Sequence, residues 1–187
     1  MGEDKAALLL AGRPLVSWTV EALRAVTAEV WLVGGRREFA SRLGLRFAPD
    51  LVAGAGPLGG IYSALMAAGS DVLVAACDMP LIRPALLRGL VSLAPGADAV
   101  VPVKDGESEP LLALYRRDCL PAIERALASG RKRAVSFFDA ARVRFVGENE
   151  WRCWDLDGRS FTNVNTPGDL TVAAAVLHAD GAGPGEG

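Results

Sequence analysis

The sequence predicts an α/β domain in which helices cover both faces of a doubly wound, mostly parallel sheet. Short apolar runs alternate with segments of helical periodicity along the chain, the pattern of helices packed on such a sheet. Residues 72–76 are apolar at every position, as expected of a strand buried on both faces. The 187 residues suffice for one core without disulfides or a structural metal. We expect a single domain over residues 1–178 and a disordered, glycine-rich tail over residues 179–187.

The first half of the chain is expected to hold two helices and three strands. Apolar residues recur at helical spacing from Leu15 and again from Leu58. Pro57 is placed to begin the second helix, and Gly69 is placed to end it. Strands are expected over residues 29–33, 45–47 and 72–76, the last of these in the middle of the sheet.

The second half of the chain shows the same alternation of expected helices and strands. Pro167 lies where a first-turn proline belongs and marks the start of the last helix. The other expected helices cover residues 86–93 and 120–130, and strands are expected over residues 99–103, 111–115 and 143–146.

Composition and charge favour a small-molecule partner. The chain has 20 basic and 22 acidic residues, so it has no basic field to hold a nucleic-acid backbone. Its apolar runs are far shorter than the roughly 20 residues that span a bilayer, and no signal peptide is visible. We therefore expect a soluble, cytoplasmic protein without nucleic-acid or membrane partners. The spacing of the three cysteines and the single histidine predicts neither disulfides nor a zinc site.

Asp78 is the first candidate for chemistry. It follows the expected strand 72–76, and in open α/β sheets ligands gather at the carboxyl ends of the strands. A carboxylate there suits Mg²⁺, which proteins usually hold by one or two carboxylates together with substrate phosphates. The alternative is a carboxylate that caps the turn before Pro80.

Asp50 offers a second carboxylate, ahead of a glycine-rich turn over residues 53–60 that leads into a helix. This turn lacks the lysine and hydroxyl residue of a P-loop and does not match the dinucleotide fingerprint. A plain tight turn explains it as well as a nucleotide pocket does, although a helix N-terminus favours anions. Lys5 is a compact charge suited to phosphate, but an ordinary surface position explains it equally.

Five motifs follow one another in a recognisable order. They are Gly2-Glu-Asp-Lys5, Gly12-Arg-Pro-Leu15, Gly56-Pro-Leu-Gly-Gly60, Cys77-Asp-Met-Pro80 and Phe161-Thr-Asn-Val-Asn-Thr-Pro167. Together they resemble molybdenum cofactor guanylyltransferase, the bacterial MobA family, from residue 1 to about residue 177. The most specific of them is the last motif. The resemblance implies a Rossmann-like fold of the nucleotide-diphospho-sugar transferase type.

The family resemblance also implies a reaction and its site. The reaction is transfer of GMP from GTP to molybdopterin, with Mg²⁺ as cofactor and release of pyrophosphate. By position, Asp78 matches the metal ligand, and Asp78 and Lys5 match the catalytic pair. The implied GTP-binding residues are Lys5, Asp50, Gly59 and Asp78, and the implied molybdopterin-binding residues are Arg133, Asn163 and Asn165. Besides GTP and molybdopterin, the resemblance allows molybdopterin-delivery proteins and molybdoenzyme chaperones as partners.

The chain departs from the family at its beginning. Family members start with a strand and a Leu-Ala-Gly-Gly loop ahead of the aspartate-lysine pair, whereas this sequence starts at the methionine just before that pair. We expect a start assigned downstream of the native one. Absence of a central strand would leave an apolar slot and unpaired backbone groups. Two alternatives stay open, a non-catalytic nucleotide- or molybdopterin-binding module and a related cytidylyltransferase.

Overall fold

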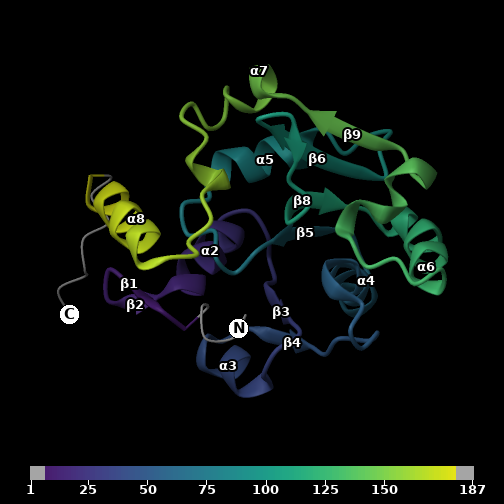
Figure 1. Cartoon of the computed structure of the whole chain (residues 1–187), viewed down its shortest axis with the longest axis horizontal. Helices are drawn as coiled ribbons and strands as arrows, with labels where there is room; N and C mark the ends of the chain where they lie inside the picture. Colours follow the sequence, from purple (N-terminus) through teal and green to yellow (C-terminus); the bar gives the residue numbers. More distant parts are fainter. Residues whose placement is uncertain (1–6, 180–187) are drawn as a thin grey trace.

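The computed structural model describes residues 7–179 and shows helices on both faces of a central sheet (Figure 1). Lys5 and residues 180–187 of the expected tail lie outside the described residues. The strands are β1 (Leu9–Leu10), β2 (Arg13–Pro14), β3 (Trp31–Val33), β4 (Arg46–Ala48), β5 (Val72–Ala75), β6 (Ala99–Lys104), β7 (Glu107–Ser108), β8 (Leu112–Tyr115) and β9 (Val143–Val146).

Each predicted helix is present near its expected bounds, and within residues 7–179 two α-helices and three 3₁₀ helices occur where none was predicted. Short 3₁₀ helices cover Arg117–Cys119, Ala134–Ala140 and Arg159–Phe161. The α-helices are α2 (Leu15–Arg24), α3 (Arg37–Arg42), α4 (Gly56–Ala68), α5 (Pro84–Ser92), α6 (Leu120–Ala128), α7 (Glu148–Trp151) and α8 (Pro167–Ala179). Within residues 7–179, no helix combines the length and apolarity that crossing a bilayer requires.

The main sheet has the strand order β5-β8-β6-β7, with β9 added beside β6. Strand β8 is antiparallel to both β5 and β6, so β5 and β6 run in the same direction. Strand β9 is parallel to β6. Three of these longer strands therefore share one direction and β8 opposes them, which agrees with the predicted mostly parallel sheet.

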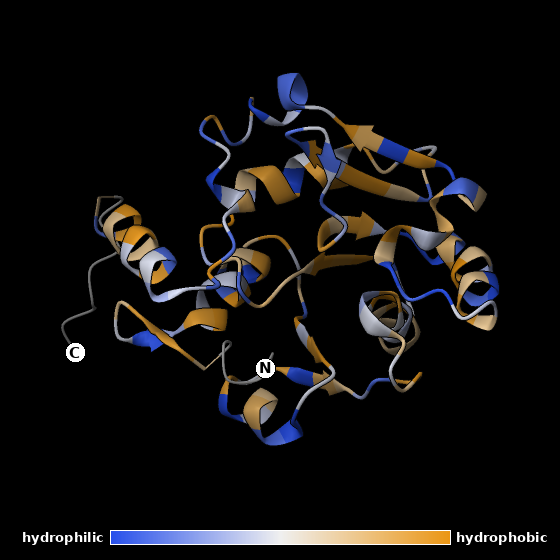
Figure 2. Ribbon diagram, in the orientation of Figure 1, coloured by the Kyte–Doolittle hydropathy of each residue, from blue (hydrophilic) through white to orange (hydrophobic). Residues whose placement is uncertain are grey.

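Alternate side chains of the main sheet enter two separate cores. Val101, Ala113 and Tyr115 pack with residues of α4 and α6. On the opposite face, Val100 and Leu114 pack with residues of α5. Because successive strand residues point to opposite faces, this alternation lets helices cover both sides of one sheet. Figure 2 shows hydrophobic residues concentrated on these strands.

Helix α4 illustrates how local sequence sets an element. Pro57 lies in its first turn, where the missing N–H of proline is not needed. Leu58, Ile61 and Leu65 recur at helical spacing and are buried. Gly69 ends the helix with φ at +63°, the left-handed conformation that glycine adopts without strain. The predicted start and stop are both confirmed.

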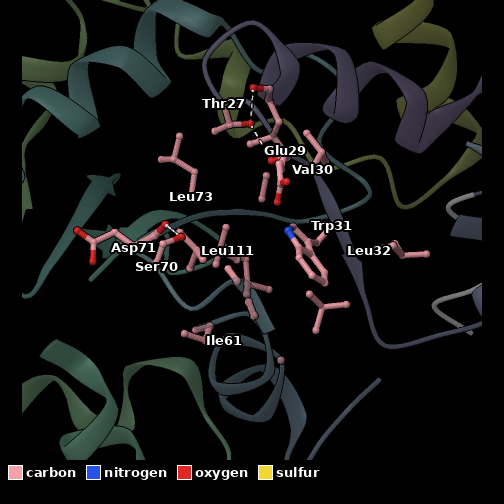
Figure 3. Close-up of a pocket in the computed structure, with 18 of the residues that line it drawn as sticks. Thr27, Glu29, Val30, Trp31, Leu32, Ile61, Ser70, Asp71, Leu73 and Leu111 are labelled. Atoms are coloured by element: carbon pink, nitrogen blue, oxygen red, sulfur yellow. Dashed lines mark hydrogen bonds between the residues drawn. The ribbon is translucent and has the colours of Figure 1, made fainter. Parts of the chain in front are cut away.

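Strands β3 and β4 form a separate two-stranded parallel sheet. Strand β5 pairs with β8 on one side, and no other strand within residues 7–179 pairs with its second edge. Its four residues are accordingly half-buried rather than buried. The prediction that residues 72–76 lie in the middle of the sheet is therefore wrong for the described part of the chain. The physical reason is that β3 pairs with β4 in the separate sheet and is divided from β5 by a cavity of about 610 Å³ (Figure 3).

A third core joins the two ends of the described chain. The β1–β2 hairpin turns at Ala11 and Gly12, both with positive φ. The indole N–H of Trp18 donates to the carbonyl of Leu10 across 3.1 Å. Val164 and residues of α8 pack on this hairpin and on α2. The segment before α8 is thereby fixed against α2, which also approaches the end of β5.

Candidate active site

Asp78 lies where the chain leaves the end of β5, and its backbone is fixed from two directions. The N–H of Val164 donates to the carbonyl of Asp78 across 2.8 Å. The buried hydroxyl of Thr19 on α2 donates to the carbonyl of Met79 across 2.9 Å. Because both contacts are made to the backbone, they hold the turn in place and leave the Asp78 side chain available.

The half-buried carboxylate of Asp78 makes no hydrogen bond or ion pair with any residue in the range 7–179. The alternative interpretation, a carboxylate that caps the turn before Pro80, requires such a hydrogen bond and finds none there. Burial, and to a smaller extent the Asp78 charge, raises the pKa of the adjacent Cys77 thiol. Since a thiol must ionise to act as a nucleophile, Cys77 is unsuited to that role at neutral pH.

Residues 163–165 form a segment without regular secondary structure beside Asp78. Val164 is only 1% exposed, whereas Asn163 and Asn165 are exposed on either side of it. The buried Val164 therefore anchors the segment and directs the two asparagines away from the core. The structure thus brings Asn163 and Asn165 near the Asp78 turn, and their contact with molybdopterin stays a prediction.

The start of α8 holds this segment from its other end. One carboxylate oxygen of Asp169 accepts hydrogen bonds from the N–H groups of Asn165 and Thr166, each at 2.8 Å. The Thr166 hydroxyl accepts from the N–H of Asp169 across 3.2 Å. This reciprocal cap satisfies N–H groups at the helix start and fixes the direction in which the chain enters α8.

A buried acid fixes the residues just upstream. Asp155 is fully buried and accepts a hydrogen bond from the Ser160 N–H at 2.9 Å. The Ser160 hydroxyl in turn accepts from the N–H of Arg83, at the start of α5. The Arg83 Nε lies 3.1 Å from a carboxylate oxygen of Asp155, but out of line for a hydrogen bond, so the contact is an ion pair. Arg83 follows the Asp78 turn in the chain, and Ser160 precedes residues 163–165. These contacts therefore join the same two segments a second time, at the start of α5.

Asp50 lies beyond the end of β4 and packs against Gly34, which follows β3. A Cβ on Gly34 would lie 2.9 Å from a carboxylate oxygen of Asp50, closer than ordinary contacts allow. Gly34 also has φ at +74°. Glycine is therefore required for this approach. The Asp50 carboxylate is exposed and has no hydrogen bond or ion pair within the described part of the chain.

The glycine-rich turn is packed more tightly than a plain connection needs. A Cβ on Gly59 would lie 2.6 Å from the Cβ of Ala55, so the glycine lets the turn fold onto the first turn of α4. Gly56 has φ at +60°. The N–H of Leu51 donates to the Ser63 hydroxyl across 2.9 Å, which ties the chain after Asp50 to α4. Gly59 therefore has a packing role, and its contact with GTP stays a prediction.

The basic residues 131–133 lie against this turn. The carbonyl of Lys132 accepts from the Leu58 N–H across 3.2 Å. The Arg131 guanidinium donates to the carbonyl of Ser136 at 2.7 Å, whereas the exposed Arg133 side chain has no such partner within residues 7–179. No hydrogen bond or ion pair in that range joins Arg133 to the two asparagines. Arg133 thus sits with the glycine-rich turn, on a different element from Asn163 and Asn165.

The described part of the site offers single carboxylates and no cluster of metal ligands. Residues 7–179 contain no group of three or more His, Cys, Asp and Glu side chains placed to hold a metal ion. An all-protein cage is therefore not part of the described structure. An unpaired carboxylate such as Asp78 fits a Mg²⁺ ion that takes its other ligands from substrate phosphates and water.

Solved structures with the same fold include nucleotidyltransferases. The 2-C-methyl-D-erythritol 4-phosphate cytidylyltransferase of Thermus thermophilus matches over 94% of both chains, with a TM-score of 0.68 and 23% identity. Molybdopterin-guanine dinucleotide biosynthesis protein A of Archaeoglobus fulgidus matches with a TM-score of 0.80 and 30% identity, over 94% of this chain and 91% of that one. Fold and site together define a nucleotidyltransferase domain.

Sequence relatives identify one family within the class of nucleotidyltransferase domains. A probable molybdenum cofactor guanylyltransferase of Pelotomaculum thermopropionicum is 41% identical over 92% of this chain and 85% of its own length. The molybdenum cofactor guanylyltransferase of Desulfosudis oleivorans is 33% identical over 95% of this chain and 89% of its own length. The MobA-like NTP transferase domain family matches residues 1–144. The chain belongs to this family, and the resemblance inferred from the motifs is confirmed.

Two residues of the site escaped sequence reasoning. Thr19 is a polar residue on an otherwise apolar helix face, a pattern that signals a buried hydrogen bond but does not name the partner. Gly34 directly follows the strand expected over residues 29–33, and its closeness to Asp50 depends on how β3 and β4 pair.

Proposed function

We propose that the protein transfers GMP from GTP to molybdopterin, forming the guanine dinucleotide cofactor and releasing pyrophosphate. The observation that carries this proposal is the hydrogen bond from the Val164 N–H to the Asp78 carbonyl. This bond supports the proposal because it joins the segment that carries the proposed acceptor-binding residues to the backbone of the residue proposed to bind the metal. The names of the relatives and of the Archaeoglobus fulgidus structure support the same substrates.

The described residues suit positioning and charge neutralisation. Mg²⁺, held by Asp78, would supply Lewis-acid stabilisation of the phosphates when bound. Asp50 and the glycine-rich turn at Gly59 would contact GTP at the other side of the site. Lys5, which lies outside the described residues, is proposed to contact the phosphates and to complete the catalytic pair with Asp78.

The reaction needs no protein nucleophile. An oxygen of the molybdopterin phosphate attacks the α-phosphorus of GTP, a new phosphorus–oxygen bond forms, and the bond between the α- and β-phosphates breaks as pyrophosphate leaves. In such transfers the protein mainly holds the two phosphates in line and neutralises developing charge. Asn163 and Asn165 would position the acceptor, and Arg133 would approach it from the glycine-rich turn. The neutral Cys77 thiol agrees with a direct transfer.

Turnover with radiolabelled GTP, molybdopterin and MgCl₂ tests the proposal. Asp78→Asn is expected to lower turnover on the order of 100-fold or more, because the metal contribution amounts to several kcal/mol. Asp139→Asn, which alters an exposed aspartate on the 3₁₀ helix over Ala134–Ala140, is the matched control and should act as the parent protein does. Full turnover by folded Asp78→Asn protein would overturn the assignment.

The same assay separates the alternatives. A nucleotide- or molybdopterin-binding module would bind GTP in calorimetry without forming product. A cytidylyltransferase would accept CTP in preference to GTP. The cytidylyltransferase of Thermus thermophilus shares only the fold at 23% identity, so it does not favour that alternative. We further propose a cytoplasmic location and, as protein partners, molybdopterin-delivery proteins and molybdoenzyme chaperones.

A further inference from the structure

Glu109 is a half-buried acid to which the proposed reaction assigns no role. Its N–H donates to the carbonyl of Pro102 on β6 across 2.8 Å, and its carbonyl accepts from the N–H of Leu112 on β8 across 3.1 Å. The backbone at Glu109 is thus held by two neighbouring strands. Its carboxylate, by contrast, makes no hydrogen bond or ion pair with any residue in the range 7–179.

Glu109 lies at the same edge of the main sheet as Asp78. Strand β8 lies between β5 and β6 and is antiparallel to both, so β8 begins where β5 and β6 end (Figure 1). The Ala76 N–H donates to the carbonyl of Leu111 across 2.8 Å. Asp78 follows the first of these two residues closely in the chain, and Glu109 comes just before the second. Since ligands of open α/β sheets gather at this edge, both carboxylates border the expected ligand region.

Strand β5 separates Glu109 from the part of the site that is proposed to hold GTP. Strand β8 pairs with one edge of β5, whereas the sheet of β3 and β4, from which Asp50 extends, lies across the cavity from the other edge. The segment that leads to Asn163 lies on the Glu109 side instead. A Cβ on Gly158 of that segment would be 3.8 Å from the Cε of Lys104, and the Lys104 charge acts on the Glu109 carboxyl. Glu109 therefore belongs to the acceptor side of the site.

The surroundings of the Glu109 carboxylate favour a ligand that donates hydrogen bonds. Burial raises the pKa of the Glu109 carboxyl, a shift that Lys104 opposes and Glu107 increases. The ionised carboxylate thus lacks part of the solvation that it would have in water, and N–H donors of a ligand would replace it. A second divalent ion fits less well, because the nearby Lys104 would repel it and residues 7–179 hold no group of three metal ligands.

We propose that Glu109 binds the pterin ring of the acceptor, through the 2-amino group and the adjacent ring N–H of that ring. An ionised carboxylate only accepts hydrogen bonds, and two parallel N–H donors engage its two oxygens as a guanidinium does. This inference rests on the proposed function, since molybdopterin supplies the ring. The guanine of GTP carries the same pair of donors, but Asp50 and Gly59, its proposed neighbours, are not on the Glu109 side of β5.

Anaerobic equilibrium dialysis with molybdopterin tests the role of Glu109 without turnover. Glu109→Gln keeps the shape of the side chain and replaces one acceptor oxygen by an NH₂ donor, so it should raise the Kd for molybdopterin about 10- to 100-fold. Glu107→Gln, the same change at a nearby exposed position, is the matched control and should bind as the parent protein does. The Kd for GTP should be equal in all three proteins.

Two results of these titrations would overturn the proposal. Equal molybdopterin Kd values for Glu109→Gln and the parent protein would show that the carboxylate does not contact the acceptor. A raised Kd for GTP would assign the carboxylate to guanine. Loss of the Glu109→Gln effect when MgCl₂ is omitted would show a metal ligand, and it would overturn the proposal as well.

Two small pteridines test the same hydrogen bonds on the parent protein, so the result does not depend on how a variant folds. Pterin has the 2-amino group, whereas lumazine has an oxygen in its place, which would repel the carboxylate. Pterin should displace molybdopterin at least about 10-fold better than lumazine, and Glu109→Gln should lose this preference. Equal displacement by the two compounds, or none by either, would contradict the proposal.

Product formation from radiolabelled GTP separates this inference from the proposed function. Binding of molybdopterin that depends on Glu109 but yields no product would refute guanylyl transfer and leave the pterin site standing. Product formation together with equal molybdopterin Kd values for Glu109→Gln and the parent protein would refute the pterin site alone. A parent protein that binds no molybdopterin would refute both.

Discussion

The hydrogen bond from Thr19 to Met79 offers the sharpest test of how the Asp78 turn is held. Thr19→Val keeps the shape of the side chain and removes its hydroxyl. The Met79 residue is 1% exposed, so its carbonyl would lose the Thr19 hydrogen bond in a place that water reaches poorly. Leaving a buried acceptor unsatisfied costs about 1–3 kcal/mol, and we expect the free energy of unfolding to fall by this amount.

Urea unfolding followed by circular dichroism measures that loss. Thr171→Val on α8 is the matched control, because the Thr171 hydroxyl makes a similar bond to the Pro167 carbonyl at an exposed position. Water can replace that bond, so the control should change stability by no more than about 0.5 kcal/mol. If the less well fixed Asp78 also loses about 1 kcal/mol of transition-state stabilisation, kcat/KM for guanylyl transfer falls about fivefold.

Equal unfolding free energies for Thr19→Val and Thr171→Val would refute the reasoning, since it depends on the burial of one carbonyl and the exposure of the other. A Thr19→Val protein that is destabilised but keeps its full kcat/KM would separate the two claims. The bond would then matter for the fold, and the position of Asp78 would be set by Val164 alone.

Two further predictions concern glycine geometry and pH. Gly34→Ala should cost about 1 kcal/mol or more from its φ of +74°, and should also weaken GTP binding in calorimetry because the new Cβ displaces Asp50. Gly44→Ala, at φ +62° and with only an ordinary contact at 3.8 Å, should show the strain and leave GTP binding unchanged. Burial raises the pKa of Cys119 from 9.0 to about 12, so the unfolded state ionises first and stability should fall as pH rises from about 9 toward 12. Cys119→Ala should flatten this part of a pH series of urea unfolding curves, and an unchanged slope would contradict the assignment.

Local sequence signals predicted many of the elements. Helices α4 and α8 have proline at the start, α4 has glycine at its end, and β9 was expected at its observed bounds. Helix α3 was not predicted, since its six residues are mostly polar and too few to show a period. The position of β5 at the edge of its sheet could not be read from its own residues. A run of four apolar residues does not reveal whether a strand pairs with it on one edge or on both.

The candidate site was predictable in part. The end of a buried-looking strand led to Asp78, and the family motif led to Asn163 and Asn165. Their closeness depends on the Val164 contact, which joins distant parts of the chain and leaves no local signature. The partners of Thr19 and Gly34 are likewise set by tertiary packing.

The link between Val164 and Asp78 has a practical consequence for chimeric proteins. An exchange of residues 161–167 between relatives, intended to change the acceptor, also replaces the segment whose main-chain N–H donates to the Asp78 carbonyl and whose buried valine holds that N–H in place. The graft will work best when residues 77–80 travel with it, because the two segments meet through their main chains and through the packing of one valine. Residues 77–80 and residues 161–167 therefore act as one structural unit, although they lie far apart in the sequence.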